Sequence, residues 1–450
     1  MLFLIDLPHI LEIIVGFSKK SEVWIITFKV MLNLLVFSLL SSAFAANWAV
    51  LVAGSGGMIN YRHQSDVFRT YKILTKNGFD PSKIIVMAYD DVAHHRGNPF
   101  PEQIFNVPDG PDVYIGADNI DYKAENVTVS KFVAVMTGNA TAAGGKVLES
   151  TSSDNVFLLF SDHGSTGLIS FPTGPDMYVD ELQDMFSEMY NKSMYNKMLV
   201  YMETCYAGSM FKDIMPTNMS IYIATASDYN ESSYAMYCGI RKYKVCLSNE
   251  FTQGWMEQSD TGNMSEITVG NQFEVAKNFT LSSYPQEYGD TTLKTDFIAE
   301  YQSGPILPPE LKTIHQMITP PIRRREGGKR VRQEDAYLSY LETAAAEDPF
   351  GEEAVEYHKQ ILIKKKEEAR RDAIASFFGM IFPDPNYATT ATSIDFKLFR
   401  RAVTTYQSIC GRLNEFSYWS ITRILSRAVA DKKLTSENFS AFESLLRQLA

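Results

Sequence analysis

Residues 155–210 decide the fold of this chain; they begin NVFLLFSDHGST (155–166) and end MLVYMETCYAGSM (198–210). Each quoted segment is a short apolar run, typical of a buried strand, followed by a polar turn. The first turn carries His163 and the second carries Cys205. Between the two segments, apolar residues recur at helical spacing over 178–192, which is enough for one crossover helix. We therefore predict parallel strands whose carboxyl ends bring His163 and Cys205 together.

Strands and helices alternate on both sides of this segment. An alternating order favours an α/β fold with a mostly parallel sheet and helices on both faces. The predicted region extends from 46 to 304. Its other strands are expected at 47–53, 84–89 and 220–226, and its other helices at 61–77, 127–136, 250–258 and 269–279.

Two different segments follow this region. Residues 305–335 contain five prolines and the basic run Arg323 to Arg332, so we predict an exposed activation linker without regular structure that is open to proteolytic nicking. From 336 to 450 the pattern is helical throughout, which predicts an all-α domain without a cluster of catalytic side chains. Its helices are expected at 337–346, 352–380, 394–410, 415–430 and 435–450.

The first 45 residues are read as an N-terminal extension and a signal peptide. Lys29, the apolar run 32–40 and the small-residue pattern at 43–45 predict a signal segment over 31–45. We expect residues 1–30 to be an over-extension of the reading frame, with an uncleaved anchor as the lesser alternative. We expect the secretory pathway, with a lysosomal, vacuolar or secreted destination and no stable membrane span. Glycosylation sequons support this expectation; they begin at Asn126, Asn139, Asn191, Asn218, Asn230, Asn263, Asn278 and Asn438.

Charge and cysteine content exclude some functions. The net charge of −11 over 450 residues argues against a nucleic-acid partner, and no cofactor or metal is called for. The acidic groups concentrate in 46–303, which we call the body, whereas the linker is basic. If the linker binds to the body, protonation of Asp and Glu at low pH should weaken this binding. Four cysteines are too few to staple a secreted chain of this size. Cys238 and Cys246 are close enough in sequence to form a disulfide, but the spacing does not decide whether they do. Cys410 would then have no partner.

Cys205 and His163 have the residue types of a thiol hydrolase. An imidazole can take the proton of a thiol, and backbone N–H groups must then face the charged oxygen of the attacked carbonyl. Gly164 lets a substrate approach the backbone closely, and the N–H of Cys205 is the natural second donor. Taken singly, a His at a strand end is more often structural, and a Cys is more often a buried small residue; their joint placement favours catalysis.

At these residues the chain resembles the legumain family of asparaginyl endopeptidases. The resemblance rests on 161–167 and 203–210 together with 60–64, and it extends over about 47–304. It implies a caspase-like fold for this region and a helical prodomain for the tail. It also implies that Cys205 is the nucleophile, His163 the base and Asn60 the amide that orients His163. Gly164 and Cys205 would form the oxyanion hole.

The resemblance also implies a pocket for an Asn side chain. Basic, acidic and hydroxyl side chains together would bind both the C=O and the NH₂ of a primary amide. These residues are Arg62, His63, Glu203, Ser232 and Ser233. Asn249 stands where the family has a further carboxylate, so we expect weaker Asn selectivity unless Glu250 replaces that carboxylate. From the sequence alone, Asn60 could instead be a turn residue, and Arg62 and His63 could be solvated.

These observations lead to a hypothesis of function. We expect a cysteine endopeptidase zymogen that cleaves proteins and peptides after Asn, and after Asp at low pH. Its own C-terminal prodomain would be the inhibitor. The linker has no Asn, so activation would need Asp335 or another protease acting at the basic run. The alternatives are a peptide ligase or transamidase of the same fold, and a catalytically weak secreted binding protein.

Overall fold

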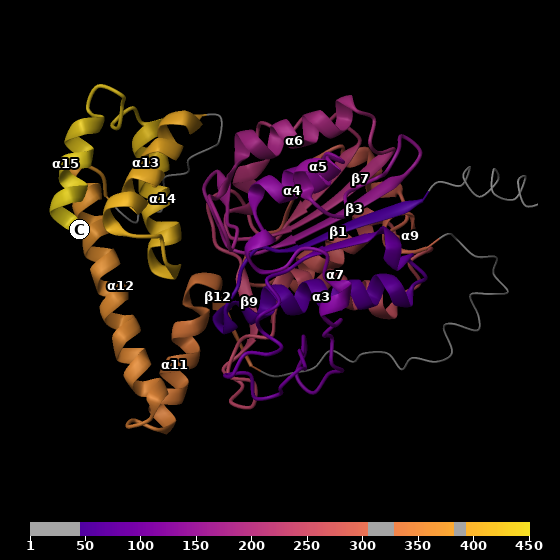
Figure 1. Cartoon of the computed structure of the whole chain (residues 1–450), viewed down its shortest axis with the longest axis horizontal. Helices are drawn as coiled ribbons and strands as arrows, with labels where there is room; N and C mark the ends of the chain where they lie inside the picture. The colour runs from indigo at the N-terminus through magenta and orange to yellow at the C-terminus, as the bar shows by residue number, and fades with distance from the viewer. Residues whose placement is uncertain (1–45, 305–327, 382–392) are drawn as a thin grey trace, which may run out of the picture. The chain divides into compact units, whose positions relative to one another are not determined.

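The computed structural model describes residues 46–304, 328–381 and 393–450. The predicted signal segment and the proline-rich part of the linker, 305–327, lie outside these residues. Within them, the chain forms a central sheet with helices on both faces, followed by a helical region (Figure 1). This arrangement confirms the predicted α/β class with an all-α C-terminal part.

The central sheet has six strands in the order β11-β8-β7-β3-β1-β2. All neighbours run parallel except β11, which pairs antiparallel with β8. Long apolar runs form the central strands because both of their faces are covered. The strands are β1 Asn47–Ala53, β2 Ile84–Met87, β3 Asn155–Ser161, β7 Lys197–Glu203, β8 Ile221–Thr225 and β11 Gln286–Gly289.

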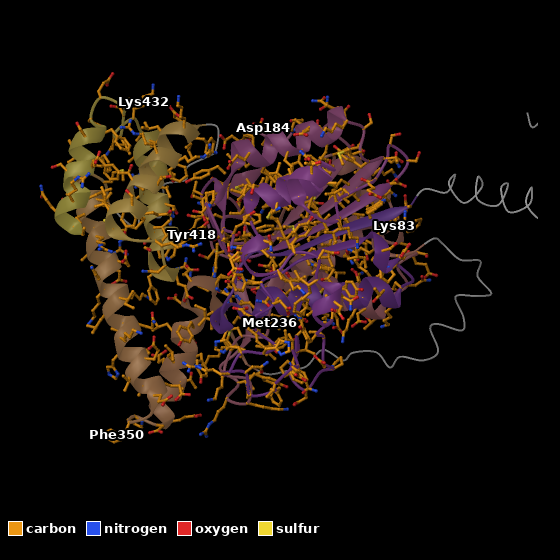
Figure 2. All side chains as sticks on the ribbon, in the orientation of Figure 1. Lys83, Asp184, Met236, Phe350, Tyr418 and Lys432 are labelled. Carbon is orange, nitrogen blue, oxygen red and sulfur yellow. A yellow bond between two sulfur atoms is a disulfide. The ribbon has the colours of Figure 1, made fainter. Side chains whose placement is uncertain are left out.

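Helices cover the two faces of this sheet. In Figure 1, α4 and α6 lie over one face and α3 and α7 over the other. Side chains fill the space between the helices and the strands (Figure 2). The helices of this region are α3 Tyr61–Lys76, α4 Val129–Met136, α5 Ala140–Ala143, α6 Val179–Asn191, α7 Glu250–Thr261, α8 Val269–Phe279 and α9 Ala299–Gln302.

Two small sheets lie beside the loops at the carboxyl ends of the central strands. One sheet joins β4 Gly164–Ser165, β5 Leu168–Ile169 and β6 Met177–Tyr178. The other has the order β10-β9-β12, with β9 at Tyr234–Cys238, β10 at Ser248–Asn249 and β12 at Lys329–Arg332. Cys238 and Cys246 form a disulfide at β9, and among the described residues Cys205 and Cys410 are free.

Strand β12 corrects one expectation. We predicted no regular structure across 305–335, but residues 329–332 pair with β9, and Gln333–Asp335 form the 3-10 helix η7. The last proline of this segment is Pro321, so the residues after it are free to donate backbone hydrogen bonds to a neighbouring edge. The helices that follow are α11 Ala336–Glu347, α12 Glu352–Phe377, α13 Phe396–Cys410, α14 Glu415–Ala430 and α15 Phe439–Leu449.

Candidate active site

The register of the central strands brings His163 and Cys205 to one edge of the sheet. Ser161 pairs with Glu203, and each reactive residue follows two positions after its member of this pair. After Cys205 the chain turns sharply, because Tyr206 adopts a left-handed backbone conformation with φ 55°. His163 and Cys205 line one cavity of about 340 Å³, together with Asn60 and Gly164.

Asn60 holds the imidazole of His163. Asn60 Oδ1 lies 2.7 Å from His163 Nε2, and Asn60 Nδ2 donates to the carbonyl of Gly56 at 2.9 Å. Because its amide nitrogen is engaged, Asn60 presents its oxygen, so Nε2 of His163 is the protonated nitrogen. Burial, with a further contribution from the charge of Arg62, lowers the pKa of His163 to about 3. The imidazole is therefore neutral, with Nδ1 unprotonated and able to accept a proton.

Gly164 lies directly against the backbone of Cys205. A Cβ at this position would lie 2.5 Å from the carbonyl oxygen of Cys205 and 2.8 Å from Thr204 Oγ1. No side chain fits there without moving the backbone that carries the thiol. The glycine therefore allows the two strand ends to approach closely, as the predicted oxyanion hole requires.

The thiol of Cys205 is covered by Glu334, which lies at the end of the predicted linker. Its Sγ lies 3.8 Å from Glu334 Oε2 and 3.9 Å from the carbonyl oxygen of Ser233. Burial raises the pKa of Cys205 well above its usual value, and the negative charge of Glu334 raises it further. In this arrangement the thiol is protonated and is a weak nucleophile.

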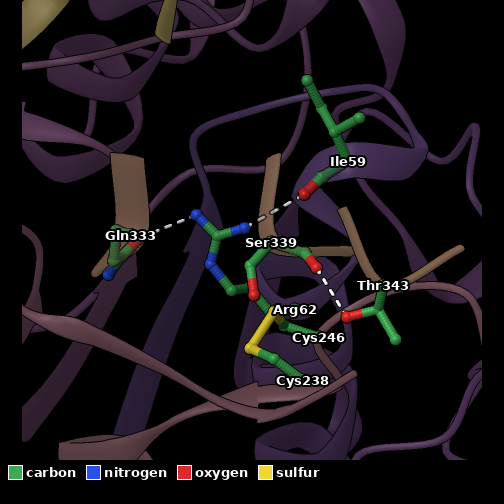
Figure 3. Close-up of a disulfide and its surroundings, with 7 residues drawn as sticks. All are labelled: Ile59, Arg62, Cys238, Cys246, Gln333, Ser339 and Thr343. Atoms are coloured by element: carbon green, nitrogen blue, oxygen red, sulfur yellow. Dashed lines mark hydrogen bonds between the residues drawn. A yellow bond between two sulfur atoms is a disulfide. The ribbon is translucent and has the colours of Figure 1, made fainter. Parts of the chain in front are cut away.

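The side-chain amide of Gln333 occupies a pocket next to Cys205. Its Oε1 accepts hydrogen bonds from Arg62 at 2.9 Å and from His63 Nε2 at 3.0 Å. Figure 3 shows the guanidinium of Arg62 between Gln333 and the carbonyl of Ile59, to which it also donates. Both pocket residues are buried, so the alternative that they are solvated at the start of α3 is wrong.

The other end of the same amide faces acceptors. Gln333 Nε2 donates to Ser233 Oγ at 2.7 Å and to Glu203 Oε1 at 3.3 Å. Ser232 instead donates to Glu334, with its Oγ 2.8 Å from Oε1. The pocket thus binds the oxygen of the Gln333 amide with donors on one side and its nitrogen with acceptors on the other.

The side chain of Asn249 is buried and its amide nitrogen is directed at Asp66. Its Nδ2 donates to Asp66 Oδ2 at 2.8 Å and to Ser161 Oγ at 3.4 Å. Glu250 accepts backbone N–H groups of the segment after α8 and pairs with Arg330, so it does not supply a carboxylate to the amide. Asp66 is a buried carboxylate of this region, and burial raises its pKa to about 7.

Sequence reasoning missed three residues of the site. Asp66 follows Arg62 by four positions on α3, a spacing that places both on one helical face and could have indicated it. Gln333 has the same primary amide as Asn, and this shared group is the signal that could have indicated it. Glu334 had no recognisable signal, because its position beside the thiol depends on how η7 docks.

A metal ion is not needed to explain the neighbouring polar cluster. Among the described residues, ligand atoms of His63, Asp162 and His163 all lie within 4.8 Å of one another. His63 Nδ1 is 2.6 Å from Ser55 Oγ, however, and each imidazole Nε2 already faces a side-chain amide oxygen.

None of the helices within the described residues has the length and apolar character that a membrane span requires.

Comparison with known proteins identifies relatives of this chain. A model of the peptidase C13 family matches residues 47–304. The vacuolar-processing enzyme delta-isozyme of Arabidopsis thaliana is 34% identical over 82% of this chain and 84% of its own length. Human legumain is 40% identical over 61% of this chain and 64% of its own length. Among solved structures, caspase-1 of Spodoptera frugiperda aligns with 55% of this chain and 89% of its own, at 11% identity and a TM-score of 0.33.

Proposed function

This chain belongs to the peptidase C13 family of legumains and vacuolar-processing enzymes and is a cysteine endopeptidase; we propose that it is a zymogen that cleaves peptide bonds after Asn. The observation that carries the proposal is the set of four hydrogen bonds around the Gln333 amide. Asn differs from Gln by one methylene and presents the same donor and acceptor atoms. A substrate Asn would place its amide in this pocket with its carbonyl carbon next to Cys205.

The proposed chemistry uses the residues around the cavity. Cys205 transfers its proton to Nδ1 of His163 and attacks the substrate carbonyl, while Asn60 keeps the imidazole in the required tautomer. The N–H groups of Gly164 and Cys205 bind the negative oxygen of the tetrahedral intermediate. His163 then protonates the leaving amine, and a water molecule, deprotonated by the same imidazole, hydrolyses the thioester.

The C-terminal region is proposed to inhibit the enzyme by occupying the site. Gln333 fills the amide pocket, and Glu334 disfavours the thiolate by its charge and by excluding water. Helix α14 contributes further contacts: Thr422 Oγ1 donates to Ser165 Oγ at 2.6 Å, and Tyr418 donates to Asp176 at 3.2 Å. The thiol would become reactive when these residues leave, because water and the imidazole could then stabilise its charge.

The proposed localisation is the secretory pathway, ending in a lysosome or vacuole or outside the cell. The sequons support it, because an oligosaccharide needs an accessible Asn. Those in 46–304 are all exposed or partly exposed: Asn126, Asn139, Asn191, Asn218, Asn230, Asn263 and Asn278. An endoglycosidase shift of the protein expressed in eukaryotic cells would test this assignment.

Hydrolysis of an Ala-Ala-Asn reporter by the acid-treated full chain tests the proposed activity. We expect turnover that Cys205→Ala abolishes, faster on Asn than on Asp reporters, with the Asp rate rising as the pH falls. Addition of an amine nucleophile would reveal ligation as a product that retains the acyl part. Absence of turnover on both reporters would refute the proposal and favour a binding protein.

A further inference from the structure

Strand β12 lies along the edge of β9 in the manner of a bound peptide. The pairing is antiparallel, with Lys329 opposite Cys238, Val331 opposite Ala235 and Arg332 opposite Tyr234, and its register shifts between Lys329 and Val331. The next residue, Gln333, donates its backbone N–H to the carbonyl of Ser233 at 3.2 Å. Addition of a strand to a sheet edge is a common way to bind an extended peptide. If the proposed function holds, this edge receives the substrate residues that precede the cleaved bond.

The residues of β12 then mark where the side chains of a substrate would lie. Gln333 takes the place of the Asn, and Arg330 stands three residues before it. Val331 packs against Ala235 and the disulfide, whereas Arg330, which lies where the register shifts, forms an ion pair with Glu250. A substrate bound along this edge, which we call the substrate track, would therefore meet an apolar site at Ala235 and the disulfide and an acidic site at Glu250. Both sites contact residues that precede the Asn.

Glu250 provides a buried carboxylate, held in place by hydrogen bonds, that can bind a cationic side chain. Its side chain has no solvent exposure, and it is the first residue of α7. Oε1 accepts the N–H of Leu281 at 3.0 Å, and Oε2 accepts the N–H of Ser282 at 3.2 Å. These bonds and the helix N-terminus hold a charged carboxylate in one orientation. Its remaining partner is Arg330, a residue of the segment that must leave on activation.

We propose that Glu250 is a specificity residue, which selects substrates with Arg or Lys three positions before the cleaved Asn. Removal of Arg330 would leave a carboxylate with one side open toward the substrate track. A guanidinium or ammonium group restores the lost ion pair, whereas a neutral side chain leaves the charge to the backbone N–H groups alone. The enzyme should therefore prefer sites with a basic residue at this position.

Arg332 provides an internal comparison on the same strand. Its guanidinium stacks over Trp419 of α14 and pairs with Glu334, and within the body it donates to Ser232 at 3.3 Å. Trp419 and Glu334 belong to the C-terminal region, so these two contacts depart with it. A basic residue directly before the Asn should consequently give little advantage, although Arg occupies both positions in β12.

Matched peptides test the proposal with the acid-activated full chain. The pair Arg-Val-Ala-Asn and citrulline-Val-Ala-Asn, each with the same reporter, differs only in charge. We expect a kcat/KM about tenfold higher for the Arg peptide, the scale of one charge-assisted hydrogen bond. The pair Ala-Val-Arg-Asn and Ala-Val-citrulline-Asn should differ far less. Equal rates within the first pair would overturn the proposal, whereas cleavage of neither pair would refute the proposed function instead.

Two variants assign the preference to one carboxylate. Glu250→Gln should bring the Arg and citrulline peptides to equal kcat/KM, while Glu266→Gln removes the same charge from an exposed position and should keep the tenfold ratio. Retention of the ratio in Glu250→Gln would overturn the assignment. Fluorescent versions of the peptides give the same comparison without turnover when they bind to Cys205→Ala protein that has been nicked within 305–327 and separated from its tail at acidic pH. Equal affinities there would also contradict the proposal.

Discussion

Glu334 Oε2 lies 3.8 Å from Cys205 Sγ, and the two side chains are buried together. An ionised carboxylate at this distance opposes the formation of a thiolate, in addition to the larger effect of burial on the Cys205 pKa. The contact therefore suppresses the nucleophile directly as well as covering it. This relationship leads to the first of four predictions.

Glu334→Gln should make the thiol of the full chain more reactive. The substitution removes the negative charge but keeps the size of the side chain, so the Cys205 pKa should fall toward its usual value. We expect alkylation by iodoacetamide at pH 8 to be roughly three- to tenfold faster, because thiolate concentration sets the rate. Asp335→Asn is the matched control, since Asp335 pairs with Lys364 at 3.0 Å. Equal rates for all three proteins would contradict the electrostatic role.

Gln333→Asn should convert the inhibitor into a substrate. The amide would keep its hydrogen-bond partners, but the shorter side chain would draw the carbonyl of residue 333 toward the thiol. We expect a new cut between residues 333 and 334 at acidic pH, detected by mass spectrometry. Gln333→Ala should instead weaken docking without this cut, because the pocket loses its hydrogen bonds.

The cut in Gln333→Asn has to depend on the chain's own thiol. The double variant with Cys205→Ala should therefore remain intact under the same conditions. A cut that persists in the double variant would come from another protease. An intact single variant that still hydrolyses an Asn reporter would show that β12 does not follow the substrate path.

Asn60→Ala should reduce turnover more than substrate binding. The imidazole would lose the acceptor that fixes its tautomer, whereas the amide pocket would keep its contacts. We expect kcat of the activated enzyme to fall by roughly 10²-fold with little change in KM. Asn119→Ala, at an exposed position, serves as the control. A rise in KM with unchanged kcat would mean that Asn60 binds substrate and does not orient His163.

The pH dependence of docking has two opposing contributions. Burial raises the pKa of Glu415 to about 7 and that of Asp176 to about 6. A raised pKa in the docked state favours docking at low pH, and this contribution is lost as the pH rises toward 7. Ion pairs such as Arg400 with Asp180 and Glu181 act in the opposite direction, because acid weakens an ion pair by protonating its carboxylate.

Glu415→Gln should therefore strengthen docking at pH 8 but change it little at pH 5. Arg400→Gln should weaken docking at both values, since it removes the ion pairs with Asp180 and Glu181. Size-exclusion chromatography of protein nicked within 305–327, from pH 3.5 to 8, measures the bound fraction. We expect release of the wild-type tail near or below pH 4. Release that grows steadily from pH 7 to pH 5 would mean that the buried carboxylates contribute nothing.

Strands and helices could be predicted because burial has a local signature. The apolar runs before His163 and Cys205 had to be strands covered on both faces, and the spacing between them allowed one helix. Strand β12 could not be predicted in this way, because its pairing with β9 depends on an edge that is distant in sequence. Its residues Lys329 to Arg332 have the composition of a solvated linker.

The sequence by itself determined the α/β fold, the pairing of His163 with Cys205 and the composition of the amide pocket. The fold and the pairing follow from hydrophobic periodicity and from parallel register, whereas the pocket residues were inferred from the resemblance to the legumain family. Only the tertiary structure decided that Gln333 fills the pocket, that Asn249 donates to Asp66, and that Glu250 faces Arg330. Each of these depends on hydrogen bonds or ion pairs between segments more than 70 residues apart in sequence, and no local pattern encodes such contacts.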